Sequence, residues 1–320
     1  MRKELAVLAA ASLLVTTATA QNLMGQSPEA QVIDVPVVQG RIDAISGVVY
    51  SQVFERGRSV RGLKMTLFVP RTKEKKPAVL YFPGGGFTSA DHEKFLEMRY
   101  ALARAGYAVA SRAVPNQFPA LLEDAKAAVR WMREHASEFG VDADRIGLLG
   151  DSAGGYVVQM AGATNGEKNW DVGDFKEVSS DVQAVVSIYG ISDLTTIGEG
   201  IGNENVHASA AVTEALLLNG PAFKDFAGAS VNADPQKAKA ASPIGHVDGT
   251  EPPFLLMHGS GDKVVSPLQS KKMFEALQNK KVEAEYVLVR GAGHGDLPWY
   301  QPGVISRVVN FFDRHLKRTE

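Results

Sequence analysis

Short apolar runs alternate with helix-like segments through most of the chain. Several of these runs are nearly continuous, without the alternation of a half-exposed strand, which is typical of strands buried on both faces of a sheet. They fall at residues 78–82, 107–110, 146–149, 182–189, 254–258 and 284–289. We therefore predict that these six segments form buried strands of one sheet.

Amphipathic segments lie between the apolar runs. The first places Phe95, Met98 and Leu102 on one helical face and stops at Gly106, which tolerates a left-handed backbone. The predicted helices cover residues 91–105, 119–139 and 304–316, and another opens at Ser266-Pro267 with an N-cap and a first-turn proline. This alternation predicts a mostly parallel sheet with helices on both faces, whose chemistry lies at the carboxyl ends of the strands.

Two regions depart from this alternation. Residues 48–54 and 63–69 are β-rich runs joined by a charged, glycine-containing turn, which favours an antiparallel N-terminal strand pair. Residues 192–247 contain a helical run at 208–218 and no convincing strand, and they are too short for a core of their own. We interpret them as an insertion over the active site of a single α/β domain that spans residues 21–320.

The first 20 residues have the features of a secretory signal. A basic start is followed by an apolar stretch over residues 5–15 and by Ala18-Thr19-Ala20, the small-residue pattern of a cleavage site. The alternative is a membrane anchor, but the stretch is shorter than the roughly 20 residues that a span needs. We expect a periplasmic or secreted protein that has no membrane contact after residues 1–20 are removed.

Composition excludes several classes of protein. The chain is 45% hydrophobic and 22% charged, as a soluble globular protein is, and its 34 basic and 36 acidic residues give a net charge of -2. Nucleic acid is therefore not an expected partner. The absence of cysteine excludes disulfides, thiolate metal sites and a thiol nucleophile. Because His207, His246 and His258 also lack metal-ligand spacing, we expect no metal and take these histidines as structural.

The motif GDSAGG at residues 150–155 is the strongest local signal. It follows the apolar run 146–149 and precedes an apolar helical run, which is the strand-turn-helix context of a nucleophile elbow. In such an elbow a side chain at Gly150 or Gly154 would collide with its neighbours, and the hydroxyl of Ser152 is exposed. The alternative is a buried glycine turn with an incidental serine.

A histidine and a carboxylate follow later strands. Asp262 lies just after the run 254–258, and His294 lies just after the run 284–289 in a glycine-flanked loop. A serine hydroxyl needs a base to take its proton and a carboxylate to orient that base. Taken alone, Asp262 is more often a residue that forms a turn, and His294 is more often an ordinary loop residue. Together, in the order Ser152, Asp262, His294, they predict a catalytic triad at one edge of the sheet.

A glycine-rich segment ends the strand at residues 78–82. Acyl transfer develops negative charge on the carbonyl oxygen, and glycines let backbone N–H groups approach that oxygen closely. We assign Gly85 and Gly86 as oxyanion donors, together with the N–H of Ala153 beside the nucleophile. A phosphate-binding loop is disfavoured because no Gly-Lys-Ser/Thr follows, and no dinucleotide fingerprint is present.

These motifs resemble the α/β-hydrolase superfamily, specifically its secreted bacterial esterase-like branch, near the hormone-sensitive-lipase and polysaccharide-deacylating groups. The resemblance covers about residues 48–316 and is carried by PGGG at 83–86, GDSAGG at 150–155, ASPI at 241–244, PPFLLMHGSGD at 252–262 and GHG at 293–295. Pro83 stands where the lipase-type loop usually has histidine, which favours the polysaccharide-esterase relatives. The resemblance implies a cofactor-independent serine esterase that acts on short-chain or carbohydrate-linked esters, of acetyl or feruloyl type.

Two other functions remain open at this point. A small exopeptidase of the prolyl-oligopeptidase type would use the same triad on amides, and a non-catalytic hydrolase-fold binding protein would use none of it. The sequence leaves the oligomeric state open. Our candidate substrate contacts are Phe87, Tyr156 and Trp299. The insertion offers further apolar residues, for most of which ordinary packing is the simpler reading: Leu216, Leu217, Leu218, Phe223 and Phe226.

Overall fold

The computed structural model describes residues 24, 27–55, 59–89, 91–112 and 117–318. The predicted signal at residues 1–20 lies outside the described residues. By their contacts, the described residues divide into two units, one up to Gln39 and one from Gly40 onward. Among the described residues, no helix is both long and apolar enough to cross a bilayer.

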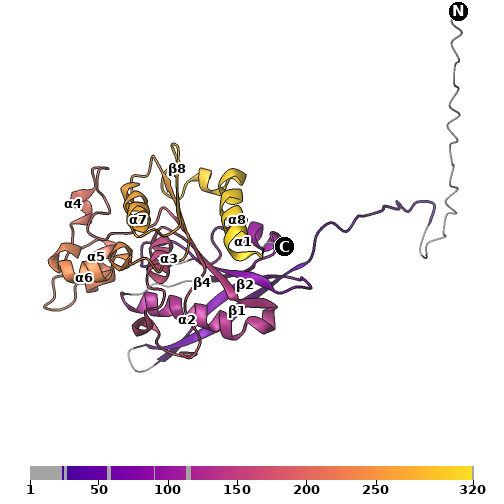
Figure 1. The fold of residues 1–320 in the computed structure, drawn as a ribbon, viewed down its shortest axis with the longest axis horizontal. Helices are drawn as coiled ribbons and strands as arrows, with labels where there is room; N and C mark the ends of the chain where they lie inside the picture. The colour runs from indigo at the N-terminus through magenta and orange to yellow at the C-terminus, as the bar shows by residue number, and fades with distance from the viewer. Residues whose placement is uncertain (1–23, 25–26, 56–58, 90, 113–116, 319–320) are drawn as a thin grey trace, which may run out of the picture. The chain divides into compact units, whose positions relative to one another are not determined.

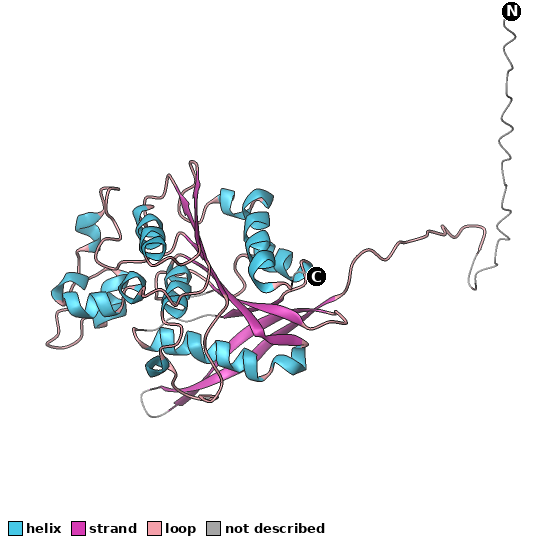
Figure 2. Ribbon diagram, viewed as in Figure 1, coloured by secondary structure: helices cyan, strands magenta, loops and turns pink. Residues whose placement is uncertain are grey.

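The described strands form a single, mostly parallel sheet (Figures 1 and 2). Their order across the sheet is β1-β2-β4-β3-β5-β6-β7-β8. The first two strands pair antiparallel, β2 pairs antiparallel with β4, and all later neighbours are parallel. The bounds are β1 (Ile42–Glu55), β2 (Ser59–Pro70), β3 (Lys76–Phe82), β4 (Ala108–Arg112), β5 (Val141–Asp151), β6 (Ala184–Ile188), β7 (Phe254–Gly259) and β8 (Ala284–Val289).

The pattern of apolar runs is confirmed by this sheet. Every residue of β3, β6 and β7 is buried, as expected for central strands covered on both faces. The predicted antiparallel pair is also present as β1 and β2, although both strands are longer than predicted. Because the six strands β3 to β8 run parallel, their carboxyl ends meet at one edge of the sheet.

Helices cover both faces of the sheet. The helices α1 and α8 pack in one apolar cluster with Met98 and Phe311, whereas α2, α3 and α7 pack in the other with Val129, Val158 and Leu277. The bounds of the helices are α1 (Leu96–Arg104), α2 (Ala120–Glu134), α3 (Ala153–Ala163), α4 (Glu204–His207), α5 (Thr213–Asn219), α6 (Pro235–Ala240), α7 (Leu268–Asn279) and α8 (Pro302–Leu316).

The predicted helices differ from the observed ones in their bounds. The differences are small for α7, which begins at Leu268, and for α8, which begins at Pro302, and larger for α1 and α2. The helix predicted from residue 91 begins at Leu96, because Phe95 adopts a left-handed backbone with φ of 60° and cannot continue a right-handed helix. The helix predicted over residues 119–139 ends at Glu134 and is followed by a 3-10 turn at Ala136–Phe139. Gly106 does take the predicted left-handed conformation, with φ of 98°.

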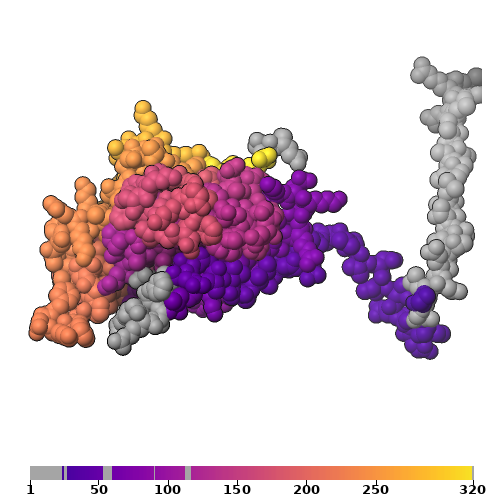
Figure 3. Space-filling model, turned by 90° about the horizontal axis from the view of Figure 1, so that it is seen from below, coloured from indigo at the N-terminus to yellow at the C-terminus, as the bar shows by residue number. Residues whose placement is uncertain are grey.

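The insertion, residues 192–247, contains the helices α4, α5 and α6, and none of the eight described strands of the sheet lies in it. The three helices lie together at the left of Figure 1, and the same salmon-to-orange colours gather at the left of Figure 3. The helical run predicted over residues 208–218 is realised as α5, which begins only at Thr213. A short bridge between Phe223 and Phe226 closes a loop that follows α5.

Candidate active site

Ser152 occupies a strained turn between β5 and α3. Its φ of 54° and ψ of -121° lie in a region that a residue with a side chain rarely adopts. A Cβ on Gly150 would lie 2.2 Å from the carbonyl oxygen of Gly154, and a Cβ on Gly154 would lie 1.9 Å from that of Phe82. The glycines therefore permit the close approach of α3 to β3 and β5 that the motif predicts.

The structure brings Ser152, His294 and Asp262 into one hydrogen-bonded chain. The Oγ of Ser152 lies 2.8 Å from Nε2 of His294. The Nδ1 of the same imidazole lies 2.7 Å from Oδ2 of Asp262. The three side chains come from the ends of β5, β7 and β8, so the parallel sheet accounts for their meeting.

The carboxylate of Asp262 fixes the tautomer of His294. Burial alone would raise the pKa of Asp262, but hydrogen bonds from His258 and His294 and from the N–H of Val264 hold it well below its usual value. A carboxylate only accepts hydrogen bonds, so Nδ1 of His294 carries the proton. Nε2 of the neutral ring is then free to accept the hydroxyl proton of Ser152.

The glycine turn, residues 84–86, lies beside the nucleophile. A Cβ on Gly84 would lie 2.8 Å from Cβ of Ser152, so the two segments are in contact. The carbonyl oxygen of Gly85 accepts from the N–H groups of Thr88 and Ser89 at 3.2 and 3.1 Å, which closes the turn. A side chain on Gly85 would collide with Ser89 at 2.0 Å.

The backbone amides of Gly85, Gly86 and Ala153 can serve as donors. Within the part of the chain that the structure describes, no acceptor takes a hydrogen bond from any of them. Ala153 also begins α3, and the N-terminus of a helix carries partial positive charge. These three amides are thus available as donors, which is the chemical requirement for an oxyanion site.

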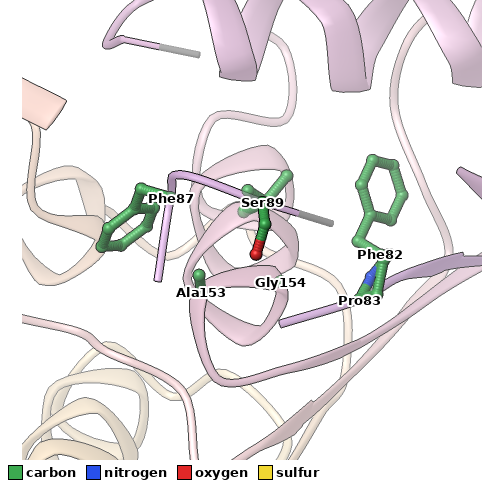
Figure 4. A pocket seen from close by; sticks show the side chains of 7 residues that line it. Phe82, Pro83, Phe87, Ser89, Ala153 and Gly154 are labelled. Carbon is green, nitrogen blue, oxygen red and sulfur yellow. The ribbon is translucent and has the colours of Figure 1, made fainter. Parts of the chain in front are cut away.

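Phe87 lines a small cavity beside the first turn of α3. The residues that border this cavity of about 10 Å³ are Phe87 on one side, Phe82 and Pro83 on the other, and Ser89, Ala153 and Gly154 between them (Figure 4). Such a volume holds about one water molecule. The ring of Phe87 is 8% exposed and packs edge-on against Tyr156, with ring centroids 5.2 Å apart.

Tyr156 and Trp299 do not lie where substrate contacts were expected. Both side chains are 0% exposed, so neither ring offers a surface to a ligand in this structure. The hydroxyl of Tyr156 donates to the carbonyl oxygen of Ala241, and Nε1 of Trp299 donates to that of Gly293. Their apolar rings complete the core, and their polar atoms support α3 and the loop of His294 from behind.

The insertion packs against the site through α5. A Cβ on Gly86 would lie 3.6 Å from Thr213, the first residue of α5. Leu217 and Leu218 are buried in the core, as ordinary packing predicts, whereas Phe223 and Phe226 are 70% and 42% exposed. The insertion thus contacts the glycine turn with α5 and exposes an aromatic pair on its own surface.

The insertion also contacts the acid loop, residues 260–266, which carries Asp262. Nε2 of His207 lies 3.2 Å from the carbonyl oxygen of Val264. The other ring nitrogen pairs with Glu214, whose hydrogen bond raises the pKa of His207. Next to this pair lies a hollow of about 350 Å³ in the insertion, lined among others by Glu199, Glu204, Asn205, His207 and Asn232.

Sequence reasoning missed several residues that contact the site. His258 is fully buried, with Nε2 3.4 Å from Oδ2 of Asp262, although it was read as merely structural. Its position four residues before Asp262, at the end of a strand, was the available signal. No motif in the sequence marks Asp151 or Tyr189 as a residue that contacts the site. Among the described residues, no group of three or more histidines and carboxylates is arranged to hold a metal ion.

The sheet topology, the strained serine turn and the order of the site residues define an α/β-hydrolase fold. The sequence model of the BD-FAE family matches residues 65–277, well over half of the 320 residues. The chain belongs to the BD-FAE family.

Curated relatives are named as ester hydrolases. The chain is 28% identical over 207 residues to the probable carboxylic ester hydrolase LipM of Mycobacterium tuberculosis, a match that covers 63% of this chain and 45% of LipM. It is 26% identical over 240 residues to isoprenylcysteine alpha-carbonyl methylesterase ICME of Arabidopsis thaliana, covering 73% of this chain and 54% of ICME. The chain thus spans about half the length of the curated relatives it matches.

Solved structures share the fold. A truncated carbohydrate esterase from gut microbiota aligns with a TM-score of 0.72 at 24% identity, over 88% of this chain and 99% of that chain. An acetyl ester-xyloside bifunctional hydrolase from Caldicellulosiruptor lactoaceticus aligns with a TM-score of 0.67 at 22% identity, over 86% of this chain and 96% of that one. These likenesses establish the common architecture.

Proposed function

We propose that this protein is a serine hydrolase that cleaves carboxylic esters through an acyl-enzyme. The observation that carries the proposal is the hydrogen-bonded chain from Ser152 through His294 to Asp262, at distances of 2.8 and 2.7 Å. The names of the curated relatives support ester cleavage as the reaction. The mechanism needs no cofactor, because each step is a proton transfer or an acyl transfer between groups of the chain, the substrate and water.

The first half-reaction acylates Ser152. Its Oγ attacks the carbonyl carbon of the ester while Nε2 of His294 takes the hydroxyl proton. The carbonyl oxygen becomes negatively charged and is stabilised by the N–H groups of Gly85, Gly86 and Ala153. The tetrahedral intermediate then collapses: the bond to the alcohol oxygen breaks, and the alcohol leaves with the proton held by His294.

The second half-reaction restores the enzyme. Water attacks the acyl carbon and gives a proton to Nε2 of His294, and the same amides stabilise the second oxyanion. Collapse of this intermediate breaks the bond to Ser152, whose oxygen recovers the proton from His294. Throughout the cycle Asp262 stabilises the imidazolium, because its carboxylate stays ionised beside Nδ1.

We propose short-chain or carbohydrate-linked esters, of acetyl or feruloyl type, as substrates. The hollow in the insertion supports a carbohydrate alcohol, because its carboxylates and amides are groups that hydrogen-bond sugar hydroxyls. The printed names of two structural neighbours, a carbohydrate esterase and an acetyl ester-xyloside hydrolase, are consistent with this class.

The test combines labelling with hydrolysis. We expect the wild type to bind a fluorophosphonate probe covalently at Ser152 and to hydrolyse p-nitrophenyl acetate. Ser152→Ala should lose labelling and about 10⁴-fold or more of kcat, as triad knockouts do in comparable enzymes, whereas Ser137→Ala, at an exposed serine outside the site, should change neither. Wild-type hydrolysis by folded Ser152→Ala would refute the proposal.

The same assay separates the rival functions. Aminoacyl and dipeptide p-nitroanilides measure the exopeptidase alternative, and acetylated and feruloylated xylan fragments measure the carbohydrate alternative. We expect esters to be cleaved faster than amides. Faster cleavage of amides would favour the exopeptidase, and a wild type that neither labels nor turns over any of these substrates would favour a binding protein.

A further inference from the structure

Asp151, the residue before the nucleophile, is a buried carboxylate surrounded by donors. Its side chain is 0% exposed. Oδ1 accepts from the hydroxyl of Tyr81 at 2.7 Å and from the N–H of Gly84 at 2.9 Å. Oδ2 accepts from Nζ of Lys94 at 2.7 Å and from the hydroxyl of Tyr189 at 3.3 Å. A carboxylate offers about four acceptor positions, so its capacity is fully used.

These four donors come from different parts of the site. Tyr81 belongs to β3, Gly84 to the glycine turn, Lys94 to the segment before α1, and Tyr189 follows β6. A buried charge is stable only while its partners remain in place, because removal of one donor leaves it poorly solvated. Asp151 therefore resists displacement of the glycine turn relative to the serine turn that carries it.

The contact with Tyr189 extends this network to the base. The ring of Tyr189 packs on the imidazole of His294, with centroids 4.7 Å apart, and on Trp299 at 4.8 Å. Its backbone has φ of 39°, a conformation that costs free energy in a residue with a side chain. Burial and the nearby Asp151 raise the pKa of Tyr189, so its hydroxyl stays protonated and continues to donate.

We propose that Asp151 is a positioning residue. It holds the glycine turn in place relative to Ser152 and, through Tyr189, it holds the imidazole of His294 in place relative to the same serine. This inference rests on the proposed ester hydrolysis. Asp151 does not touch the reacting atoms; it acts through the N–H of Gly84 and the ring of Tyr189. Lys94 compensates its charge, so the network orients the donors without placing a net negative charge beside the oxyanion.

Asp151→Asn is the decisive variant. An asparagine can still accept from Gly84 through Oδ1, but its amide would direct a donor at Nζ of Lys94 and at the hydroxyl of Tyr189. We expect kcat for p-nitrophenyl acetate to fall about 10- to 100-fold, less than the roughly 100- to 1,000-fold seen when one oxyanion donor is lost outright, because the donors stay present and only their placement is disturbed. KM should change less than about twofold, because a positioning defect acts on the transition state and not on ground-state binding.

Asp313→Asn is the matched control. Asp313 in α8 also accepts from a tyrosine hydroxyl, that of Tyr107 at 2.7 Å, and from a lysine, Nζ of Lys317 at 2.7 Å. Tyr107 precedes β4, so this second network lies at the amino end of the parallel strands, opposite to Ser152. Asp313→Asn should therefore leave kcat for p-nitrophenyl acetate unchanged.

Substitutions of Tyr189 and Lys94 test the proposal independently of Asp151→Asn. Tyr189→Phe keeps the ring on His294 and loses the hydroxyl, and we expect a loss of kcat of about twofold to fivefold, because one hydrogen bond is lost. Tyr189→Leu removes the ring as well and should lose at least about tenfold. The loss of kcat in Lys94→Met should lie between the losses in these two variants, because Lys94→Met leaves the carboxylate of Asp151 without its cation.

Fluorophosphonate titration distinguishes positioning from folding. A positioning defect leaves the number of labelled sites near one per chain and lowers the rate of labelling. Wild-type kcat in folded Asp151→Asn, or a loss of kcat that matches a loss of labelled sites, would overturn the inference. If Asp151→Asn does not fold, wild-type kcat in both Tyr189→Phe and Lys94→Met would overturn it. A wild type that does not label refutes the proposed function instead.

Discussion

His258 and Asp262 form a fully buried pair, with Nε2 of the imidazole 3.4 Å from Oδ2 of the carboxylate. The same oxygen faces His294 at 2.7 Å, so two histidines converge on one atom of Asp262. Nδ1 of His258 lies 2.7 Å from the hydroxyl of Ser270, which donates to it, and Nε2 lies 3.1 Å from the carbonyl oxygen of Val265. Nε2 therefore carries the proton of His258 and is directed at the acid loop.

This arrangement predicts that His258→Leu lowers both the free energy of unfolding and kcat. It leaves the hydroxyl of Ser270 and the carbonyl oxygen of Val265 without their partner in a buried position, which costs about 1–3 kcal/mol for each unsatisfied group. For the two groups together, the free energy of unfolding, measured with urea, should fall by about 2–6 kcal/mol, and kcat should fall with it. Ser270→Ala keeps the donor on Nε2 and should lower kcat less. Equal kcat in wild type and His258→Leu would contradict the prediction.

Asp262→Asn should abolish most of the activity. An asparagine can donate to Nδ1 of His294 and so favour the wrong tautomer, a change that costs about 10⁴-fold in a comparable triad. The variant should remain folded and keep KM within a few fold. Steady-state kinetics on p-nitrophenyl acetate, with circular dichroism as the control for folding, checks this.

The depressed pKa of Asp262 predicts how stability depends on pH. A group whose folded-state pKa lies below its unfolded value of about 3.9 stabilises the fold above that value and loses the contribution as pH falls toward the folded-state pKa. The difference in unfolding free energy between wild type and Asp262→Asn should therefore be largest near neutral pH and shrink below about pH 4. A difference that grows on acidification would show that Asp262 does not act as a stabilising carboxylate.

His207 predicts the opposite dependence. Its hydrogen bond with Glu214 raises its folded-state pKa, so its contribution to stability is complete below the unfolded value of about 6.5 and is lost as pH rises through the folded-state pKa. Glu214→Gln should thus destabilise the protein more at pH 6 than at pH 9. Glu138→Gln, at an exposed pair with His135, is the control and should have little effect at either pH.

Two glycines allow a matched test of the serine turn. Gly154→Ala places a Cβ 1.9 Å from the carbonyl oxygen of Phe82, so it should displace α3 from β3 and abolish fluorophosphonate labelling. Gly303→Ala, near the start of α8, meets nothing within 4 Å and should be neutral or stabilise by up to about 1 kcal/mol. Thermal unfolding and labelling of both variants decide the matter, and a stable, labelled Gly154→Ala would contradict the described geometry.

The strands and the meeting of Ser152, Asp262 and His294 were predictable because they depend on local patterns. Continuous apolar runs identify buried parallel strands, and parallel strands deliver their following residues to one edge. No such rule fixed the orientation of Tyr156 or Trp299. Whether an aromatic side chain faces a substrate or the core depends on neighbours far away in sequence, such as Ala241 for Tyr156.

Residues without a motif were also beyond prediction. Nothing in the sequence around Phe95 indicated a left-handed backbone, which delays α1 by five residues relative to the prediction. Asp151 occupies a variable position of the G-x-S-x-G pattern, so the pattern itself assigns it no role. Its four donors lie on separate elements, and only the packed fold brings them together.

The position of β8 at the border of the sheet has a consequence for truncated chains. Among the described strands, β8 is the last in sequence and pairs with β7 alone, and the loop that follows it carries His294. A nascent or proteolytically clipped chain that stops before residue 290 holds the nucleophile, the acid and the glycine turn, yet has no proton acceptor for Ser152. Under the proposed mechanism such a chain would not turn over, so hydrolysis of p-nitrophenyl acetate reports that the segment carrying His294 is present and folded.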